Sequence, residues 1–478
     1  MKILLSAPYD EIMDPSQQQD IPERSNLWSG GIQAVQLSGK VFDLTTIILS
    51  FFLALFSFVI FWPIISQIEF EEAFFTPLVP FLISIFGTFG IAPTDLVRVL
   101  FIVSFMISTV GVYLLTRDLT RRQLTAILAS VLYLVPPIPV FVLTFVRRGV
   151  LETELGSAKS FFTIIYGDGA NFLALAMIPF VSLFILRYLR DGLKIDLVVS
   201  VALCSLILLA NGPQSLGLFL ILAIIFLTQL FLGNARAKVS RLFAIVFLSA
   251  GLVSFWYTPN FWYSGLTYIA SQLIDNIQVL FPLPIIVILI SMFFSFVFFA
   301  RREDRIAIFV TLLSFVVFLG VVGLWFVTGR SFVPHPHRLF PDLIMFGAMV
   351  VALLLSMIVD RIHFISVIGQ KFVWGPAKIF VSLIFAVLSF LGLSLLAYSL
   401  SPFAVLAVSG PGGIWTKIRI SVLAERKEAL ELAGGNFQLI SFRGDSWQIS
   451  FGVFVSVLFV LIFIGIIVKN LTEEQEVG

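Results

Sequence analysis

Two groups of ionisable side chains stand out in a chain that contains few of them. The first is basic, because Arg330, His335, His337 and Arg338 fall within nine residues of the segment TGRSFVPHPHRLFPD. A guanidinium group binds phosphate oxygens through two parallel hydrogen bonds, and imidazole exchanges protons near neutral pH. The segment therefore suits a phosphate or pyrophosphate group. Two alternatives are arginines that extend toward lipid headgroups and a zinc ion held by the two histidines.

The second group is acidic and consists of Glu69, Glu71 and Glu72, which directly follow a long apolar run. Mutual repulsion and partial desolvation of neighbouring carboxylates raise the pKa of at least one of them, which suits a general base. Paired carboxylates can also hold a hard divalent cation through their oxygens. The alternative is that all three are solvated residues at the end of a helix.

A third candidate is Asp168, which lies between two glycines at the start of an apolar run. Flanking glycines allow a sharp turn or a close approach of the backbone, whereas an aspartate at this position also suits a helix cap. Asp95 and Arg98, three residues apart, are expected to pair with each other.

The composition restricts the class of protein that can carry these residues. Of the 478 residues, 59% are apolar and 12% are charged, and the mean hydropathy is +1.05. Soluble domains have about 25% charged residues, so a soluble enzyme, a nucleic-acid-binding protein and a disordered chain are excluded. The single cysteine excludes a disulfide framework and a thiolate metal site. The apolar runs show no alternation of period two, so we expect an all-α polytopic membrane protein.

Runs of about 20 apolar residues, the length that crosses a bilayer, predict about twelve transmembrane helices. They lie near residues 44–66, 94–116, 124–146, 171–189, 195–211, 214–233, 241–258, 283–300, 306–327, 341–360, 377–398 and 449–468.

Basic residues gather beside alternate ends of these helices, which places both termini in the cytoplasm. The predicted parts are a cytoplasmic tail over 1–43, a multi-spanning domain over 44–398, an extracytoplasmic subdomain over 399–448, and a last helix with its tail over 449–478. The apolar segment 73–92 would invert the later basic clusters if it crossed, and its prolines and glycines disfavour a straight helix. We expect it to lie in the outer interface or to re-enter from it.

The outer loops carry the remaining predictions about structure. Residues 415–432 have helical spacing of apolar side chains, and FQLISF and WQISF, separated by RGDS, suggest a hairpin. The aromatic run FWYTPNFWY at 255–263 suits a belt at the membrane interface, or less simply a platform that stacks against sugars.

Four stretches resemble the lipid-linked-sugar glycosyltransferases of the multi-spanning GT-C fold and their membrane relatives, over residues 44–360. They are the acidic loop after the first span, GVYLLTRDLTRRQLTAILASVLYLVPP, GDGANFLALAMIPFVSLFILRYLRDG, and the late loop HPHRLFPDLIMF. The resemblance implies that Glu71 or Glu72, with Glu69 as a further candidate, is the catalytic base or a metal ligand. It also implies that Arg338 holds the polyprenyl phosphate of the donor. The family's first loop usually carries an aspartate, whereas this chain has only glutamates there.

The resemblance therefore implies an inverting glycosyltransferase of the plasma membrane. Its partners would be membrane lipid, a polyprenyl-phosphate-linked sugar and an acceptor at the extracytoplasmic face, with no nucleic acid, and a divalent cation is left open as a cofactor. Two other classes fit the same chain. About twelve spans also suit a transporter or lipid flippase, although intramembrane carboxylates are scarce. A non-catalytic membrane scaffold could bind a partner through residues 399–448.

Overall fold

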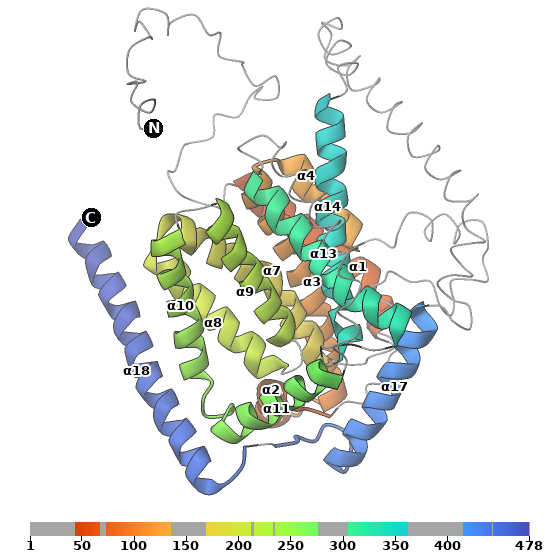
Figure 1. Ribbon diagram of the computed structural model, residues 1–478, viewed down its shortest axis with the longest axis vertical. Helices are drawn as coiled ribbons and strands as arrows, with labels where there is room; N and C mark the ends of the chain where they lie inside the picture. The colour runs from red at the N-terminus through yellow and green to blue at the C-terminus, as the bar shows by residue number, and fades with distance from the viewer. Residues whose placement is uncertain are drawn as a thin grey trace, which may run out of the picture. The chain divides into compact units, whose positions relative to one another are not determined.

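The long apolar runs of this chain fold as α-helices, because a backbone surrounded by hydrocarbon must satisfy its own N–H and C=O groups (Figure 1). The computed structural model describes residues 44–66, 73–134, 169–211, 215–232, 235–275, 305–329, 331, 333, 335–361, 414–441 and 443–477. Within these residues the regular structure is helical, and β pairing is limited to one isolated bridge between Phe74 and Leu439.

The described residues form a succession of α-helices and a 3₁₀ helix along the chain. They are α1 (Leu44–Ile65), α2 (Leu78–Gly87), α3 (Pro93–Thr120), α4 (Gln123–Leu134), α7 (Gly169–Asp191), α8 (Lys194–Ala210), α9 (Ser215–Leu232), α10 (Ala235–Leu252), α11 (Pro259–Asp275), α13 (Arg305–Thr328), the 3₁₀ helix η3 (Pro336–Leu339), α14 (Phe340–Arg361), α17 (Ile414–Ala433) and α18 (Ser446–Val477).

The chain divides into two units, Met1–Leu49 and Ser50–Gly478. Of the first unit, the structure describes only the residues from 44 onward, which form the beginning of α1. The arrangement described below is that within the second unit.

Five helices in the described part of the chain are long and apolar enough to cross a membrane. They are Pro93–Thr120, Asn171–Asp191, Arg305–Phe326, Pro336–Met357 and Ser446–Val468. Large apolar side chains are exposed on several helices, α18 among them, which is the surface expected of a protein embedded in lipid. The described residues therefore confirm the expectation of a helical, apolar chain of the kind found in all-α membrane proteins.

The predicted spans can be compared with these helices one by one. Those near 283–300 and 377–398 lie outside the described residues, and the span at 124–146 is described only as far as Leu134. Each of the others overlaps a described helix. The largest differences are at 241–258, where α10 runs from Ala235 to Leu252, and at 449–468, where α18 runs from Ser446 to Val477.

The hydrophobic core of the second unit lies where α1, α3 and α7 meet. Phe61 of α1 stacks on Phe105 of α3 with ring centroids 4.3 Å apart. Phe172 of α7 packs against Phe101 and Phe105 at 4.9 and 5.2 Å. The same buried cluster includes Val422 of α17, so this later helix is part of the core.

Basic residues bind the helix termini together at one end of the bundle, which we call the basic end. Arg190 of α7 pairs with Asp118 of α3 at 3.2 Å, and Arg122 donates to the Ser356 hydroxyl of α14 at 3.0 Å. Arg241 of α10 donates to the last backbone carbonyls of α7. A cation at a helix C-terminus is favourable because the unpaired carbonyls there carry partial negative charge.

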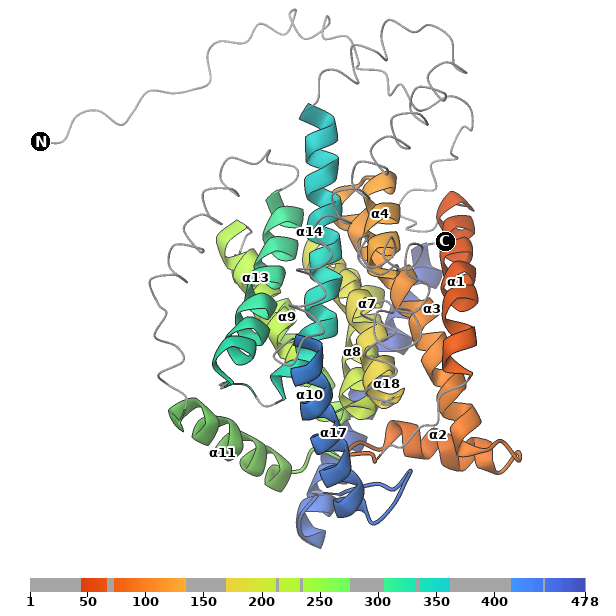
Figure 2. The same ribbon diagram turned by 90° about the vertical axis from the view of Figure 1, so that its right-hand side faces the viewer.

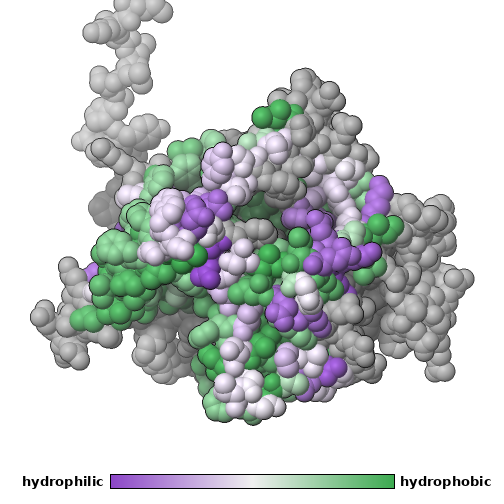
Figure 3. Space-filling view, turned by 90° about the horizontal axis from the view of Figure 1, so that it is seen from below, coloured by the Kyte–Doolittle hydropathy of each residue, from purple (hydrophilic) through white to green (hydrophobic). Residues whose placement is uncertain are grey.

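The opposite end of the bundle, which we call the site end, carries α2, α11 and α17 (Figures 1 and 2). Figure 2 shows α2 running across the direction of the long helices. With 10 residues, α2 is too short to span a bilayer, in agreement with the interfacial position predicted for 73–92. Seen from this end, hydrophilic residues form separate patches among apolar ones (Figure 3).

One prediction for the site end is wrong, and a second holds only in part. WQISF belongs to α18, which begins at Ser446, and the strand-like FQLISF pairs through Leu439 with Phe74 instead of folding back as a hairpin. The aromatic run is only partly a belt, because Trp256 and Tyr257 are buried and donate to the backbone carbonyls of Phe75 and Leu208. Both differences come from long-range partners that local periodicity does not reveal.

Helix α18 lies against α10 and the turn that follows it, and small residues permit the contact. A Cβ added to Gly452 would come within 2.4 Å of the Ser254 carbonyl oxygen, and one added to Gly251 would meet the Phe459 ring. Beside them, the Ser456 hydroxyl accepts from the Phe255 N–H at 2.7 Å. Close backbone approach at small residues is a common way for membrane helices to associate.

Gly452→Ala is expected to destabilise the protein by about 1–3 kcal/mol, because the new methyl group collides with backbone that cannot rotate away. The apparent Tm of the purified chain in detergent measures this effect. Gly465→Ala is the matched control on the same helix, because a Cβ there meets nothing within 4 Å. Equal melting temperatures for the two variants would contradict the close contact.

Candidate functional site

The basic segment before α14 is shaped by a proline and an unusual backbone conformation. His335 has φ +49° and ψ +52°, in the left-handed region that few residues other than glycine adopt. Pro336 then begins η3, which leads directly into α14 at Phe340. A left-handed residue of this kind costs of order 1–3 kcal/mol and is often found at functional sites. The turn presents His335, His337 and Arg338 within one short piece of backbone.

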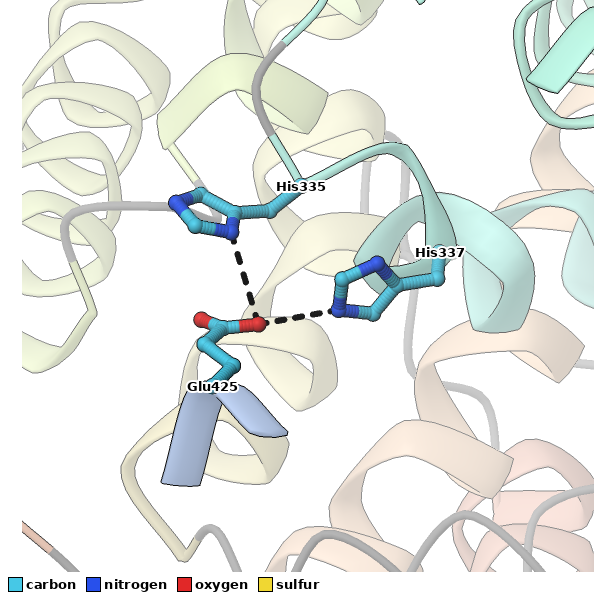
Figure 4. Close-up of side chains that lie close together, drawn as sticks. All are labelled: His335, His337 and Glu425. Atoms are coloured by element: carbon cyan, nitrogen blue, oxygen red, sulfur yellow. Dashed lines mark hydrogen bonds and ion pairs between the residues drawn. The ribbon is translucent and has the colours of Figure 1, made fainter. Parts of the chain in front are cut away.

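These three side chains converge on one carboxylate, that of Glu425 in α17. Nη2 of Arg338 lies 2.6 Å from Glu425 Oε1. Nε2 of His337 and Nδ1 of His335 lie 2.9 and 3.4 Å from the other oxygen, Oε2. Figure 4 shows both imidazole rings turned toward this same oxygen. An ionised carboxylate only accepts hydrogen bonds, so each ring nitrogen that bonds it carries a proton.

The members of this cluster differ in their access to solvent. The side chain of His337 is 6% exposed, that of Arg338 11% and that of Glu425 15%, whereas His335 is 41% exposed. The His337 ring also lies against Trp325 of α13, with ring centroids 5.7 Å apart. Three members of the cluster are therefore largely buried, and His335 is the exposed one.

Burial alone would raise the pKa of the Glu425 carboxyl, because it disfavours the charged form. The positive charge of Arg338 and the hydrogen bonds from His335 and His337 outweigh this effect and hold the pKa well below its usual range. Glu425 is therefore a charged anchor, whose oxygens attract cations, and is unsuited to act as a general base.

Helix α17 is held at the site end by contacts of residues that precede Glu425 in the helix. One turn earlier, Val422 packs into the core cluster with Phe101 and Phe172. Near the start of the helix, Lys417 donates to the Phe326 carbonyl at 2.8 Å and lies over the Phe326 ring at 4.7 Å. The carboxylate thus sits on a helix that apolar contact holds against the bundle.

A second set of contacts fixes the chain just after the acidic group of the first loop. The Phe74 N–H donates to the Gln438 carbonyl at 2.9 Å, and the Ile440 N–H donates to the Phe74 carbonyl at 2.8 Å. The Phe74 ring stacks on Phe437 with centroids 6.4 Å apart. Phe437 also packs against the core cluster that contains Val422. The anchor of the first loop and the helix that carries Glu425 are therefore connected through one aromatic residue.

The structure describes some of the predicted site residues and not others. It brings His335, His337 and Arg338 together, and it pairs Asp95 with Arg98 at 3.0 Å as expected. The remaining candidates, Glu69, Glu71, Glu72, Asp168 and Arg330, lie outside the described residues.

Glu425 is the residue that sequence reasoning missed, although the helix that carries it was predicted. A signal was present in the spacing. Glu425 lies three residues after Val422 and four before Ala429, which puts a carboxylate on the apolar face of the helix. A charge on the buried face requires a partner, and the basic segment before α14 supplies three of them.

Comparison with known proteins identifies no relative of this chain. No protein-family model matches the chain, and no curated protein or solved structure matches it either.

The ion pair between Arg338 and Glu425 is expected to stabilise the docking of α17. In a double-mutant cycle of Arg338→Gln, Glu425→Gln and the double variant, we expect a coupling free energy of about 1–3 kcal/mol. Each single change leaves the other charge poorly solvated, so the double variant loses less than the sum. The free energy of unfolding in mixed micelles measures the coupling.

The same cycle on Lys427 and Glu431 is the control, because this pair lies on α17 but is 3.8 Å apart and 80% and 69% exposed. Its coupling is expected to stay within about 0.5 kcal/mol of zero. Similar coupling free energies for the two pairs would mean that the contact of Arg338 with Glu425 does not stabilise the docking of α17.

Proposed function

We propose that the protein is an integral membrane glycosyltransferase of the polyprenyl-phosphate-sugar type with a GT-C-like fold. The observation that carries the proposal is the convergence of His335, His337 and Arg338 at the site end of an apolar helical bundle. A guanidinium group and two imidazole rings beside apolar helices suit an anionic lipid headgroup, because they can donate hydrogen bonds to its phosphate while the lipid chain stays among the helices.

The position of the first loop supports the same proposal. The sequence places Glu72 two residues before Phe74. The backbone of Phe74 is hydrogen-bonded to the segment that follows α17, and its ring packs on Phe437 of that segment. An acidic group that immediately precedes this anchor is suited to act at the same end of the bundle as Arg338.

In the proposed reaction, a first-loop glutamate takes the proton of an acceptor hydroxyl. The acceptor oxygen forms a bond to the anomeric carbon of the donor sugar as the bond from that carbon to the phosphate oxygen breaks. The electron pair leaves with the polyprenyl phosphate, whose charge Arg338 and the neighbouring histidines stabilise. Attack from the face opposite the phosphate inverts the configuration of the sugar.

The proposed topology has about twelve spans in the plasma membrane, with the basic end and both termini in the cytoplasm and the site end outside. It is supported by Arg122, Arg190 and Arg241, which lie together at one end of the bundle. Arginine and lysine beside helix ends are enriched in cytoplasmic loops. The proposed site then faces the extracytoplasmic side.

Replacing Glu71 and Glu72 together by Gln is expected to reduce sugar transfer by at least about 100-fold, the usual contribution of a general base. The full-length protein in nanodiscs is incubated with synthetic polyprenyl-phosphate mannose, glucose or galactose and with a membrane extract that supplies acceptors. Mass spectrometry measures the polyprenyl phosphate released.

Glu428→Gln is the matched control, because this exposed carboxylate lies on α17 and is not part of the group formed by His335, His337 and Glu425. The Glu428→Gln protein should transfer sugar at the rate of the unchanged protein. It should have the same apparent Tm as the protein that carries Glu71→Gln and Glu72→Gln. Full activity of the Glu71→Gln, Glu72→Gln protein would remove the first-loop glutamates from the mechanism and with them the proposed reaction.

The proposed topology predicts which cysteine positions react with an impermeant maleimide in intact cells. In a Cys204→Ser background, Glu428→Cys should be labelled from outside, and Gln123→Cys only after the membrane is permeabilised. Both positions are exposed, so accessibility to water is matched. Labelling of Gln123→Cys in intact cells would invert the orientation and place the site end in the cytoplasm.

A further inference from the structure

His335, His337 and Glu425 form a set of potential metal ligands, and Glu425 has no part in the proposed glycosyl transfer. Each offers one ligand atom, and these three atoms all lie within 4.8 Å of one another. Two come from the turn before α14 and the third comes from α17, so segments far apart in the chain contribute to one point in space (Figure 4).

The distances from the carboxylate oxygen to the two ring nitrogens are close to those of a zinc site. Zinc bound tetrahedrally at about 2.0–2.1 Å requires ligand atoms about 3.4 Å apart. Oε2 of Glu425 lies 3.4 Å from His335 Nδ1 and 2.9 Å from His337 Nε2. The first distance already fits, and the second requires an opening of about half an ångström. Rotation of two side chains at their ends provides a movement of this size.

Arg338 prepares the carboxylate for this role. Its Nη2 binds Oε1 of Glu425 at 2.6 Å, which leaves Oε2 directed at the two rings. Partners that orient a ligating group are a regular part of metal sites and commonly change the affinity by 10–100-fold. Arg338 therefore acts as a positioning residue for the ligand set.

We propose that His335, His337 and Glu425 bind a divalent cation of the zinc class and thereby fasten α17 to the turn before α14. Two imidazole nitrogens and one carboxylate oxygen are ligands that zinc accepts, and this set leaves a fourth position. His335 is the exposed member of the cluster, so the fourth position is on its side and takes water or an anionic oxygen. The proposal does not depend on the glycosyltransferase assignment.

The test uses the full-length protein in detergent, freed of metal with a chelator and then titrated with ZnCl₂. Isothermal titration calorimetry and elemental analysis after gel filtration are expected to give one tightly bound zinc per chain. Co²⁺ as a second probe should give the strong visible absorption of a tetrahedral site. No lipid-linked sugar is present, so the result is independent of any transferase activity.

Variants locate the bound ion. Glu425→Gln and His337→Ala should each weaken zinc binding by at least 100-fold, and Arg338→Gln by about 10–100-fold. His335→Ala should weaken zinc binding as much as the other two ligand variants do. Because this side chain is 41% exposed, the change is compatible with correct folding. Glu428→Gln, on the same helix but outside the cluster, should bind zinc as the unchanged protein does.

Two results would overturn the proposal. One is the absence of tight zinc binding by the unchanged protein, in which case Glu425 only accepts hydrogen bonds from the two histidines. The other is unchanged zinc affinity in the His335→Ala protein with a normal gel-filtration profile, which would move the ion to other residues. A retained zinc site in a protein that transfers no sugar would reject the proposed function alone.

Discussion

The carboxylate of Glu425 is the point on which the arrangement of the site end depends. A charge that is mostly removed from water is unfavourable unless it is paired and hydrogen-bonded. Glu425 meets this requirement only when α17 lies beside the turn before α14, where Arg338 and two histidines surround it. Apolar contacts of Val422 bring the helix to the bundle, but such contacts tolerate sliding. The pairing of charges has stricter geometry, and it specifies how α17 lies against the turn before α14.

The same end of the molecule shows how a membrane-type chain completes backbone hydrogen bonding where helices stop. The segment at Phe74 pairs with residues 438–440, the Thr76 hydroxyl donates to the Ala210 carbonyl, and the Trp256 indole donates to the Phe75 carbonyl. Each bond joins parts of the chain that are more than a hundred residues apart. Irregular backbone near the hydrocarbon is favourable only when it is satisfied in this way. The loops of the site end therefore form a defined support for the cluster at Glu425.

The helices were the predictable part of the structure, since hydropathy reports a requirement that each apolar segment satisfies alone. The spans near 94–116 and 171–189 match α3 and α7 closely, and the amphipathic helix at 415–432 matches α17. For the candidate site, sequence reasoning found the basic segment but not its partner. It missed Glu425 because a carboxylate in an amphipathic helix is normally solvated, and only tertiary packing turns this one inward. The predicted hairpin failed for the same reason, because Leu439 has its partner at Phe74.

Helix α18 touches protein along a narrow line, where Gly452 and Ser456 meet the end of α10, and most of its circumference is exposed apolar surface. A surface of this kind is suited to contact with the acyl chains of a bilayer. The Gln448 side chain accepts from the Asn260 N–H at the start of α11, and this bond ties the first turn of α18 to an amphipathic neighbour. The apolar surface that lipid would cover is thereby joined, through one hydrogen bond, to the end of the bundle that carries the Glu425 cluster (Figure 1).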